Sequence, residues 1–169
     1  MARLGCKCGA EMTNTVAPSE HILNIYYMKE AEDAIRDNPN IRLWDFYTGW
    51  DEKNNRKISF KRRKELVEYW YCTECKKIYE VQAISCGKML RGFEPSKEYP
   101  EKESEISKEL VVLWDVEMDN CLSDENMTLK KYLNKNNNRR YFISEDEVFV
   151  LVKNNQNETI AVYKQFELS

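Results

Sequence analysis

The fold is decided by one stretch of the chain, EYWYCTECKKIYEV at residues 68–81. Aromatic and aliphatic residues flank the CTEC turn on both sides, which predicts two strands, Leu66–Cys72 and Ile78–Ile84. A third strand, Lys88–Phe93, is expected after a short glycine-containing turn. A turn with two cysteines between antiparallel strands is the local structure on which zinc ribbons are built.

A second pair of cysteines lies near the amino terminus, where Cys6 and Cys8 belong to the sequence CKCG. Gly9 suits a tight turn at this place because glycine adopts positive φ without steric cost. Two such turns supply the four sulfur ligands that zinc prefers, although the first has one residue between its cysteines instead of the usual two. We therefore predict a structural zinc site with four ligands, Cys6, Cys8, Cys72 and Cys75.

The other candidate ligands are less well placed. His21 begins a predicted strand and Cys86 lies in a predicted turn, and whether either contributes to the metal site stays open. Cys121 is expected to be a partly buried small apolar residue rather than a nucleophile. A disulfide is the alternative to a metal, and we expect it less because no apolar signal segment directs the chain to an oxidising compartment.

Composition divides the chain into two parts. The segment EPSKEYPEKESEISKE, residues 94–109, is rich in charge and contains two prolines, which is typical of a linker. We predict a zinc-ribbon unit with a long insertion at residues 1–94, a linker at 95–109 and an α+β unit at 110–169.

Each part is expected to contain a strand, a helix, a strand and a hairpin, in that order. In the first part the strand is His21–Tyr27 and the helix is Lys29–Asp37, followed by Asn40–Trp50 as a short strand or an aromatic loop. In the second part the elements are Leu110–Val116, Asp124–Leu133, Arg140–Ile143, Val148–Lys153 and Thr159–Phe166. The second part is either a degenerate, metal-free copy of the first or an appended unit. The predicted fold class is α+β, a zinc ribbon with antiparallel β-hairpins and short helices.

Charge is distributed unevenly along the 169 residues, whose formal net charge is -3. The basic cluster Lys53–Lys64 is either a solvated loop or a contact to nucleic acid. Trp114 and Tyr132, in the second part, are either exposed anchors for a partner or core residues. An acidic cluster nearby is either a solvent-facing helix start or a surface for a basic protein partner; its members are Asp115, Glu117, Asp119, Asp124 and Glu125.

The segments CKCGAEM and EYWYCTECKKIYEV, with a Tyr-Tyr strand between them, resemble small bacterial zinc-ribbon proteins of uncharacterised function. The resemblance covers about residues 3–93 and implies that the four cysteines are metal ligands; no other functional residue carries over. Small acidic bacterial proteins with no visible active site also resemble immunity proteins, which block a toxin by covering its surface. That resemblance implies a role in binding.

The sequence spells out no Gly-rich phosphate loop and no Ser/His/Asp set, and it has a single histidine. Four cysteines also leave a metal without an open position, so we expect no enzyme. No apolar stretch approaches the roughly 20 residues that span a bilayer, so we expect a cytoplasmic protein without membrane contact. The expected function is immunity-type inhibition of a toxin by stoichiometric binding, and the expected partner is a protein such as a basic toxin domain. The alternative is a nucleic-acid-associated zinc ribbon in transcription or translation.

Overall fold

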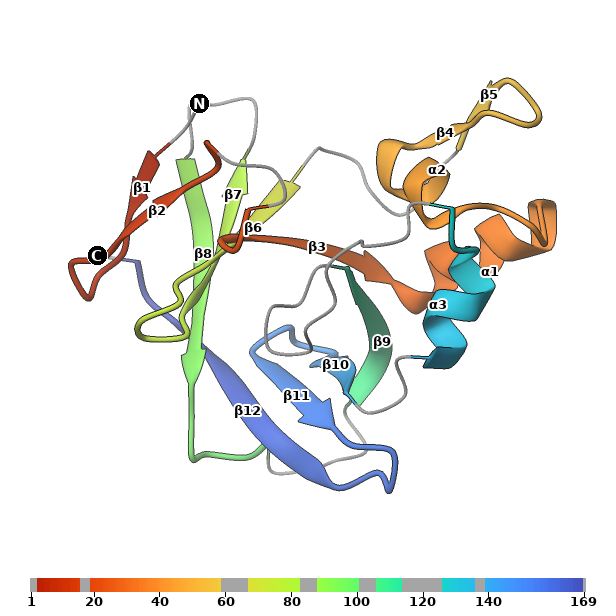
Figure 1. Ribbon diagram of the computed structural model, residues 1–169. Coiled ribbons are helices and arrows are strands. Elements are labelled where there is room, and N and C mark those ends of the chain that lie inside the picture. The colour runs from red at the N-terminus through yellow and green to blue at the C-terminus, as the bar shows by residue number, and fades with distance from the viewer. Residues whose placement is uncertain are drawn as a thin grey trace.

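The computed structural model in Figure 1 describes residues 3–15, 19–58, 67–82, 88–100, 106–113, 126–135 and 139–168. Its centre is a closed barrel in which every neighbouring pair of strands is antiparallel, in the order β10-β11-β12-β8-β7-β6-β3-β9, with β9 returning to β10. The strands of the barrel are β3 (Ile22–Tyr27), β6 (Val67–Tyr71), β7 (Ile78–Gln82), β8 (Lys88–Pro95), β9 (Ile106–Leu113), β10 (Arg140–Ser144), β11 (Phe149–Lys153) and β12 (Thr159–Phe166).

The predicted fold class, an α+β zinc ribbon of hairpins and short helices, is therefore wrong, because the protein is mostly sheet and its strands close into a barrel. The physical reason lies in the strands, which are apolar on both faces. On β6, Tyr71 packs with Leu23 and Val112, while its neighbour Trp70 packs in a separate cluster with Tyr79. Successive side chains of a strand point to opposite faces, so both faces need covering. Closure covers the inner faces and leaves no sheet edge unpaired.

Two seams join the first four strands to the last four. At one seam β3 pairs with β9, where Ile25 lies opposite Val112, and at the other β8 pairs with β12, where Phe93 lies opposite Gln165. The strand order has an internal symmetry. It stays the same when each of the first four strands is exchanged with its counterpart among the last four, β3 with β9, β6 with β10, β7 with β11 and β8 with β12. Strands from both predicted units thus share one barrel, and the ancestry of the second unit as a copy of the first stays a prediction.

The predicted linker is partly strand. β8 ends at Pro95 and β9 begins at Ile106, so only the residues between them connect the two halves of the barrel. The strand that was predicted to start at Leu110 begins four residues earlier, at Ile106. Strand pairing with β3 and β10 outweighs the charged composition that suggested a linker.

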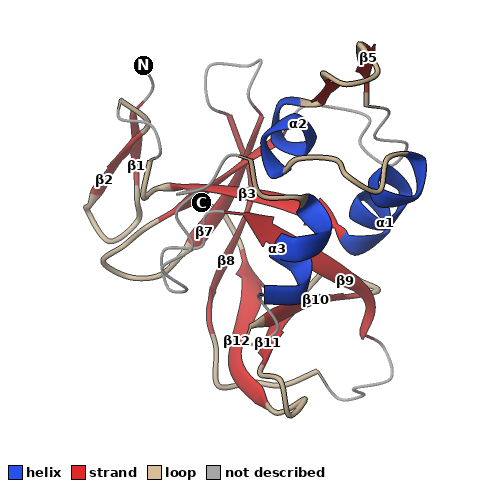
Figure 2. Ribbon diagram, turned by 45° about the vertical axis from the view of Figure 1, so that its right-hand side comes forward, coloured by secondary structure: helices blue, strands red, loops and turns tan. Residues whose placement is uncertain are grey.

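Within the described residues, three helices lie together on one side of the barrel, an arrangement that Figures 1 and 2 show. They are α1 (Met28–Asp37), α2 (Leu43–Thr48) and α3 (Leu129–Lys135). Their apolar faces pack against the outer side of β3 and β9 in a core that includes Tyr26, Phe46 and Leu113. The helix α2 lies where a strand or loop was expected at Asn40–Trp50. None of the helices among the residues that the structure describes is long and apolar enough to cross a membrane.

An N-terminal hairpin covers another part of the barrel wall. Its strands are β1 (Arg3–Gly5) and β2 (Glu11–Thr13), with Leu4 opposite Met12. Met12 is fully buried and packs in one cluster with Trp70 and Tyr79 on the outer faces of β6 and β7. The hairpin has only three residues in each strand, too few to be stable alone in water. Its position must therefore be fixed by contacts with the barrel.

One end of the barrel interior is polar. Arg91 on β8 forms an ion pair with Glu80 on β7, and its Nη1 donates to Oε2 of Glu147 at 2.8 Å. The hydroxyl of Tyr27, at the end of β3, donates to the other oxygen of Glu147 at 3.4 Å. Glu147 lies in the turn between β10 and β11, so this network links the two halves of the barrel through charge as well as through strand pairing.

Candidate metal centre

Four cysteine sulfurs converge between the N-terminal hairpin and the turn that joins β6 to β7. The Sγ atoms of Cys6, Cys8, Cys72 and Cys75 all lie within 4.8 Å of one another. Two of the separations join the two turns, at 3.4 Å from Cys6 to Cys75 and 3.6 Å from Cys8 to Cys72. Four sulfurs at about 2.3 Å from a tetrahedral ion lie about 3.8 Å apart. The four cysteines are therefore close enough to bind one metal ion.

Each pair of cysteines sits on a hydrogen-bonded turn. In the first, the amide of Cys6 donates to the carbonyl of Ala10 at 2.8 Å, and the amide of Gly9 donates to the carbonyl of Cys6 at 2.9 Å. Gly9 has φ of 93°, as expected for a glycine at this turn. In the second, the amide of Cys72 donates to the carbonyl of Lys77 at 2.9 Å, so both turns hold their sulfurs at fixed positions.

A tyrosine on β7 contacts the sulfur cluster from the barrel side. The hydroxyl oxygen of Tyr79 lies 3.1 Å from Sγ of Cys6 and accepts a hydrogen bond from the amide of Lys7 at 3.1 Å. Tyr79 is completely buried. Because its oxygen already accepts a bond from an amide, its own hydrogen is available to the sulfur. The sequence predicts Tyr79 only as a strand residue. Its packing in one cluster with Cys72 depends on the three-dimensional fold.

The protonation states of the cysteines differ. Burial opposes ionisation of Cys6, but hydrogen bonds from the backbone of Cys8 and from Tyr79 outweigh it and lower the pKa of Cys6 to about 7. Burial and the neighbouring sulfurs raise the pKa of Cys75 to about 12. Burial also raises the pKa of Cys72. Without a cation, only part of this cluster ionises at neutral pH, because several thiolates at this separation repel one another.

The carboxy-terminal strand also reaches the cluster, and Figure 1 shows the C-terminus beside β1 and β2. Nζ of Lys7 donates to the carbonyl of Glu167 at 2.7 Å. Nζ atoms of Lys7 and Lys77 lie 4.8 and 4.9 Å from the ring centre of Phe166. These lysines place positive charge near the cysteines, where it offsets the charge of thiolates. Residues from the first and last strands of the chain thus meet at one site.

His21 is held away from the cysteines as a structural residue. It is buried, and its Nδ1 lies 3.1 Å from the carbonyl oxygen of Tyr71. The group of possible metal ligands found among the described residues contains the four cysteines and not His21. Cys86 lies outside the described residues, so its contribution stays open.

The predicted partner surfaces are only partly described. The basic cluster Lys53–Lys64 is described as far as Ile58, and Lys53 and Lys57 are exposed. Tyr132 is a core residue and not an exposed anchor, since it is buried and its hydroxyl donates to the carbonyl of Val112 at 2.9 Å. The acidic residues and Trp114 lie outside the described part of the chain: Trp114, Asp115, Glu117, Asp119, Asp124 and Glu125.

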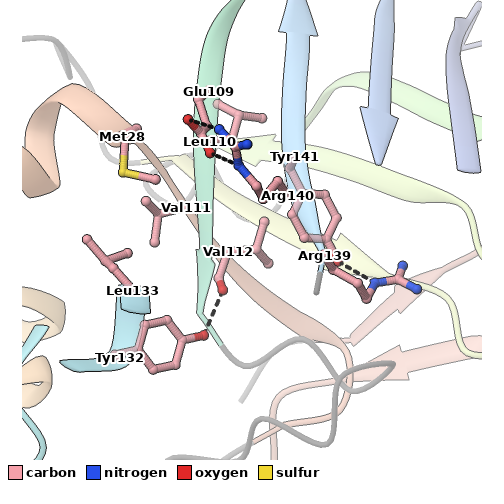
Figure 3. A pocket seen from close by; sticks show the side chains of 10 residues that line it. All are labelled: Met28, Glu109, Leu110, Val111, Val112, Tyr132, Leu133, Arg139, Arg140 and Tyr141. Atoms are coloured by element: carbon pink, nitrogen blue, oxygen red, sulfur yellow. Dashed lines mark hydrogen bonds and ion pairs between the residues drawn. The ribbon is translucent and has the colours of Figure 1, made fainter. Parts of the chain in front are cut away.

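A pocket lies beside α3, β9 and β10, and Figure 3 shows the side chains that line it. Its charged groups are engaged with protein neighbours. Nε and Nη2 of Arg140 donate to the two carboxylate oxygens of Glu109 at 2.8 and 3.0 Å, and Nε of Arg139 donates to the hydroxyl of Tyr141 at 3.3 Å. The ten lining residues include no cysteine, serine or histidine.

The chain belongs to a family described as a domain of unknown function (DUF8617), which it matches over residues 2–103. The match includes both cysteine turns and the strands β1 to β8, among them the short strands β4 (Trp50–Asp51) and β5 (Arg56–Lys57), and it ends before β9. No curated protein and no solved structure shows significant similarity to the chain.

Proposed function

We propose that the four cysteines bind zinc and that this ion has a structural role. The support is the geometry of the sulfurs, whose separations of 3.4 and 3.6 Å and overall span of 4.8 Å suit a tetrahedral ion. Zinc and iron are the metals that four thiolates commonly bind, and sites with four cysteines are typically structural because no coordination position remains for a substrate.

The proposed ion fastens the N-terminal hairpin to the barrel. Cys6 and Cys8 come from the turn between β1 and β2, whereas Cys72 and Cys75 come from the turn between β6 and β7. A metal bound to all four joins two segments that are far apart in the sequence. It thereby keeps the hairpin over the buried side chain of Tyr79, which would otherwise be exposed to water.

Metal analysis tests the identity and the ligands of this site. We expect one zinc per chain in protein purified without added metal, and loss of the zinc in Cys72→Ser. Cys121→Ser is the matched control and should keep one zinc per chain. Cys86→Ser decides whether that cysteine contributes. Iron in the wild-type protein, or zinc retained in Cys72→Ser, would contradict the proposal.

We propose further that the protein acts by stoichiometric binding of a protein partner, as an immunity-type protein that neutralises a bacterial toxin. The observation that carries this proposal is the four-cysteine centre, which as a closed site has no position for catalysis. A closed barrel fastened by a metal is a rigid scaffold, and rigid scaffolds lose little conformational entropy on binding. The only histidine is engaged with the backbone of Tyr71, which further favours binding over acid–base chemistry.

Capture of a partner tests this function. Zinc-loaded, tagged protein is incubated with nuclease-treated lysate of the native host, and captured proteins are identified and then mixed with it in purified form. We expect a 1:1 complex with one protein whose toxic activity falls in proportion to the amount added. A captured partner that is not toxic when expressed alone, or inhibition at far less than one equivalent, would contradict immunity.

A further inference from the structure

Three aromatic side chains are exposed close together in the sequence. Trp44 and Tyr47 lie on α2 and Trp50 lies on β4 (Trp50–Asp51), with exposed fractions of 37%, 36% and 44%. They are three of the six exposed large hydrophobic side chains among the described residues. The ring centres of Trp44 and Tyr47 are 5.5 Å apart. Leu43 and Phe46 of the same helix are buried, so α2 presents one apolar side to the core and a second, aromatic side to water.

Two lysines accompany these rings. Trp50 lies directly opposite Lys57 in the pairing of β4 with β5 (Arg56–Lys57), so both side chains leave the same face of this hairpin. Opposed residues of an antiparallel pair have Cβ atoms about 5 Å apart. Lys53 follows in the turn between the strands and is also exposed. An aromatic ring and a cation therefore stand side by side on one surface.

The acidic side chains within residues 42–58 already form ion pairs with arginines. Nη2 of Arg42 lies 2.6 Å from Asp45 and 2.5 Å from Glu52. Nε of Arg56 lies 3.6 Å from Asp51. Within residues 42–58 these three are all of the acids, against four basic residues, two arginines and two lysines, so the segment has a net charge of +1. Lys53 and Lys57 thus leave a net positive charge, which complements an anionic ligand.

The hairpin that carries Trp50 is held rigidly. Asp51 is almost completely buried and accepts hydrogen bonds from Nδ2 of Asn38 at 3.3 Å and from Nδ2 of Asn54 at 2.6 Å. Gly49, which has φ of 72°, ends α2, and its carbonyl accepts the amide of Ile58 at 2.8 Å. Little conformational freedom is lost when a ligand binds a surface that is already ordered.

We propose that these residues, Trp44, Tyr47, Trp50, Lys53 and Lys57, form an aromatic-lysine face that binds single-stranded nucleic acid. The exposed rings stack on unpaired bases and the lysines contact phosphates. Double-stranded nucleic acid fits this face less well because its bases are already stacked on each other. An acidic protein segment also fits less well because it offers negative charge without flat rings. The elements that carry this face, α2, β4 and β5, lie on the opposite side of the molecule from β1 and β2, as Figure 1 shows, so the face is separate from the metal site.

Binding is tested with three probes of equal length and matched fluorescent label. They are a twelve-nucleotide oligothymidylate, the same strand with abasic sites in place of the bases, and a twelve-residue oligoglutamate. We expect the oligothymidylate to bind at least about 5-fold more tightly than either control, because stacking on each base strengthens binding by about this factor or more. Two phosphate contacts give a salt slope of about -1.4, so affinity falls about 7-fold between 50 and 200 mM salt.

Variants assign the binding to the face. Trp50→Ala should weaken oligothymidylate binding about 5- to 150-fold, while Lys57→Gln should weaken it and reduce the salt slope by about 0.7. The controls are Leu90→Ala on β8 and Lys131→Gln on α3, both at exposed positions elsewhere, which should bind as wild type does. Thermal unfolding confirms that each variant is folded.

Three results would overturn the proposal. The first is absence of oligothymidylate binding by the wild type at 100 µM and low salt, a concentration that equals the weakest Kd in the range of about 10⁻⁴ to 10⁻⁶ M typical of non-specific binding. The second is equal affinity for the abasic strand or for oligoglutamate, which would identify a site for anionic polymers or acidic proteins. The third is unchanged binding in Trp50→Ala. None of these outcomes bears on capture of a toxin, which is measured after nuclease treatment.

Discussion

The hydroxyl of Tyr79 lies 3.1 Å from Sγ of Cys6, a contact that joins the first cysteine turn to strand β7 of the barrel. A hydrogen bond to a ligand sulfur disperses its negative charge and fixes its orientation. We therefore expect Tyr79→Phe to weaken zinc binding about 10- to 100-fold, the usual effect of removing a group that contacts a metal ligand. Competition with a chromophoric chelator measures the affinity.

The control for this prediction is Tyr132→Phe. Tyr132 is also buried, but its hydroxyl bonds to the carbonyl of Val112 beneath the helices. Tyr132→Phe loses the bond to Val112, and Tyr79→Phe loses the bonds with Cys6 and with the amide of Lys7, at about 1 kcal/mol for each bond. Only Tyr79→Phe should change the zinc affinity, and an equal change in both would show that the contact with Cys6 has no particular role.

Removal of the proposed zinc should release the N-terminal hairpin before the barrel unfolds. At a free concentration 1,000 times Kd a bound ligand adds about 4 kcal/mol to stability, and for a chain of this size each kcal/mol corresponds to about 2 to 4 °C in Tm. We expect chelation to lower Tm by about 8 to 16 °C. Trypsin should then cut after Lys7, which is fastened between the two cysteines of the first turn.

The matched measurement is proteolysis of zinc-loaded protein under the same conditions. Early cleavage after Lys7 should appear only in the chelated sample, with the residues of β6 to β12 remaining resistant. Identical cleavage in both samples would mean that the hairpin is held by Met12 and its other apolar contacts without help from the metal.

Gly92 on β8 lies directly opposite Phe166 on β12, where these two strands pair. A Cβ atom at position 92 would lie 2.4 Å from the ring of Phe166. The ring has little freedom to retreat, because Lys7 and Lys77 lie near it and it contacts Tyr79 edge to face at 5.8 Å. We expect Gly92→Ala to reduce the free energy of unfolding by about 1 to 3 kcal/mol, the range for overpacking.

A double-mutant cycle separates this overlap from other effects of alanine. In the Phe166→Ala background the ring is absent, so adding Gly92→Ala should cost much less than it does in the wild type. Denaturant unfolding of the four proteins gives the coupling energy. If Gly92→Ala lowers the free energy of unfolding equally in the wild type and in Phe166→Ala, the loss arises from the backbone of β8 and not from overlap with the ring.

The local parts of this architecture were predictable, and the reason is that they depend on neighbours in the sequence. The hairpin at Val67–Gln82 and the helix at Met28–Asp37 lie close to their predicted bounds, since turn residues and apolar periodicity define them. Cysteine spacing also identified the four residues that come together. The seam between Ile25 and Val112 has no such local signal, because strand pairing across many residues depends on the whole set of strands.

Of the candidate site, only the four cysteines were predicted from the sequence. Tyr79 reads as one more aromatic strand residue, and its role follows from the register that places Trp70 opposite it and from the hairpin packed above. Phe166 reaches the cluster from the end of the chain, through closure of the barrel that the sequence did not indicate. Trp44 and Tyr47 were taken for a strand or loop, although the buried positions Leu43 and Phe46, three residues apart, fit a helical period.

The last prediction concerns acid stability and Asp51. Burial alone would raise its pKa, but hydrogen bonds from Asn54 and the charge of Arg56 outweigh burial, so the pKa of Asp51 lies below its usual value. A carboxyl group with a lower pKa in the folded state contributes stability that is present above its unfolded pKa of about 3.9 and is lost as pH falls through the folded value. Asp51→Asn removes the charge and should cost about 1 to 3 kcal/mol at pH 7, as for a buried group left with mismatched partners. Urea unfolding from pH 7 down to pH 2 should therefore show the two proteins converging below about pH 4. A constant difference across that range would mean that Asp51 acts through shape and hydrogen bonding alone, with its ionisation contributing nothing to the fold.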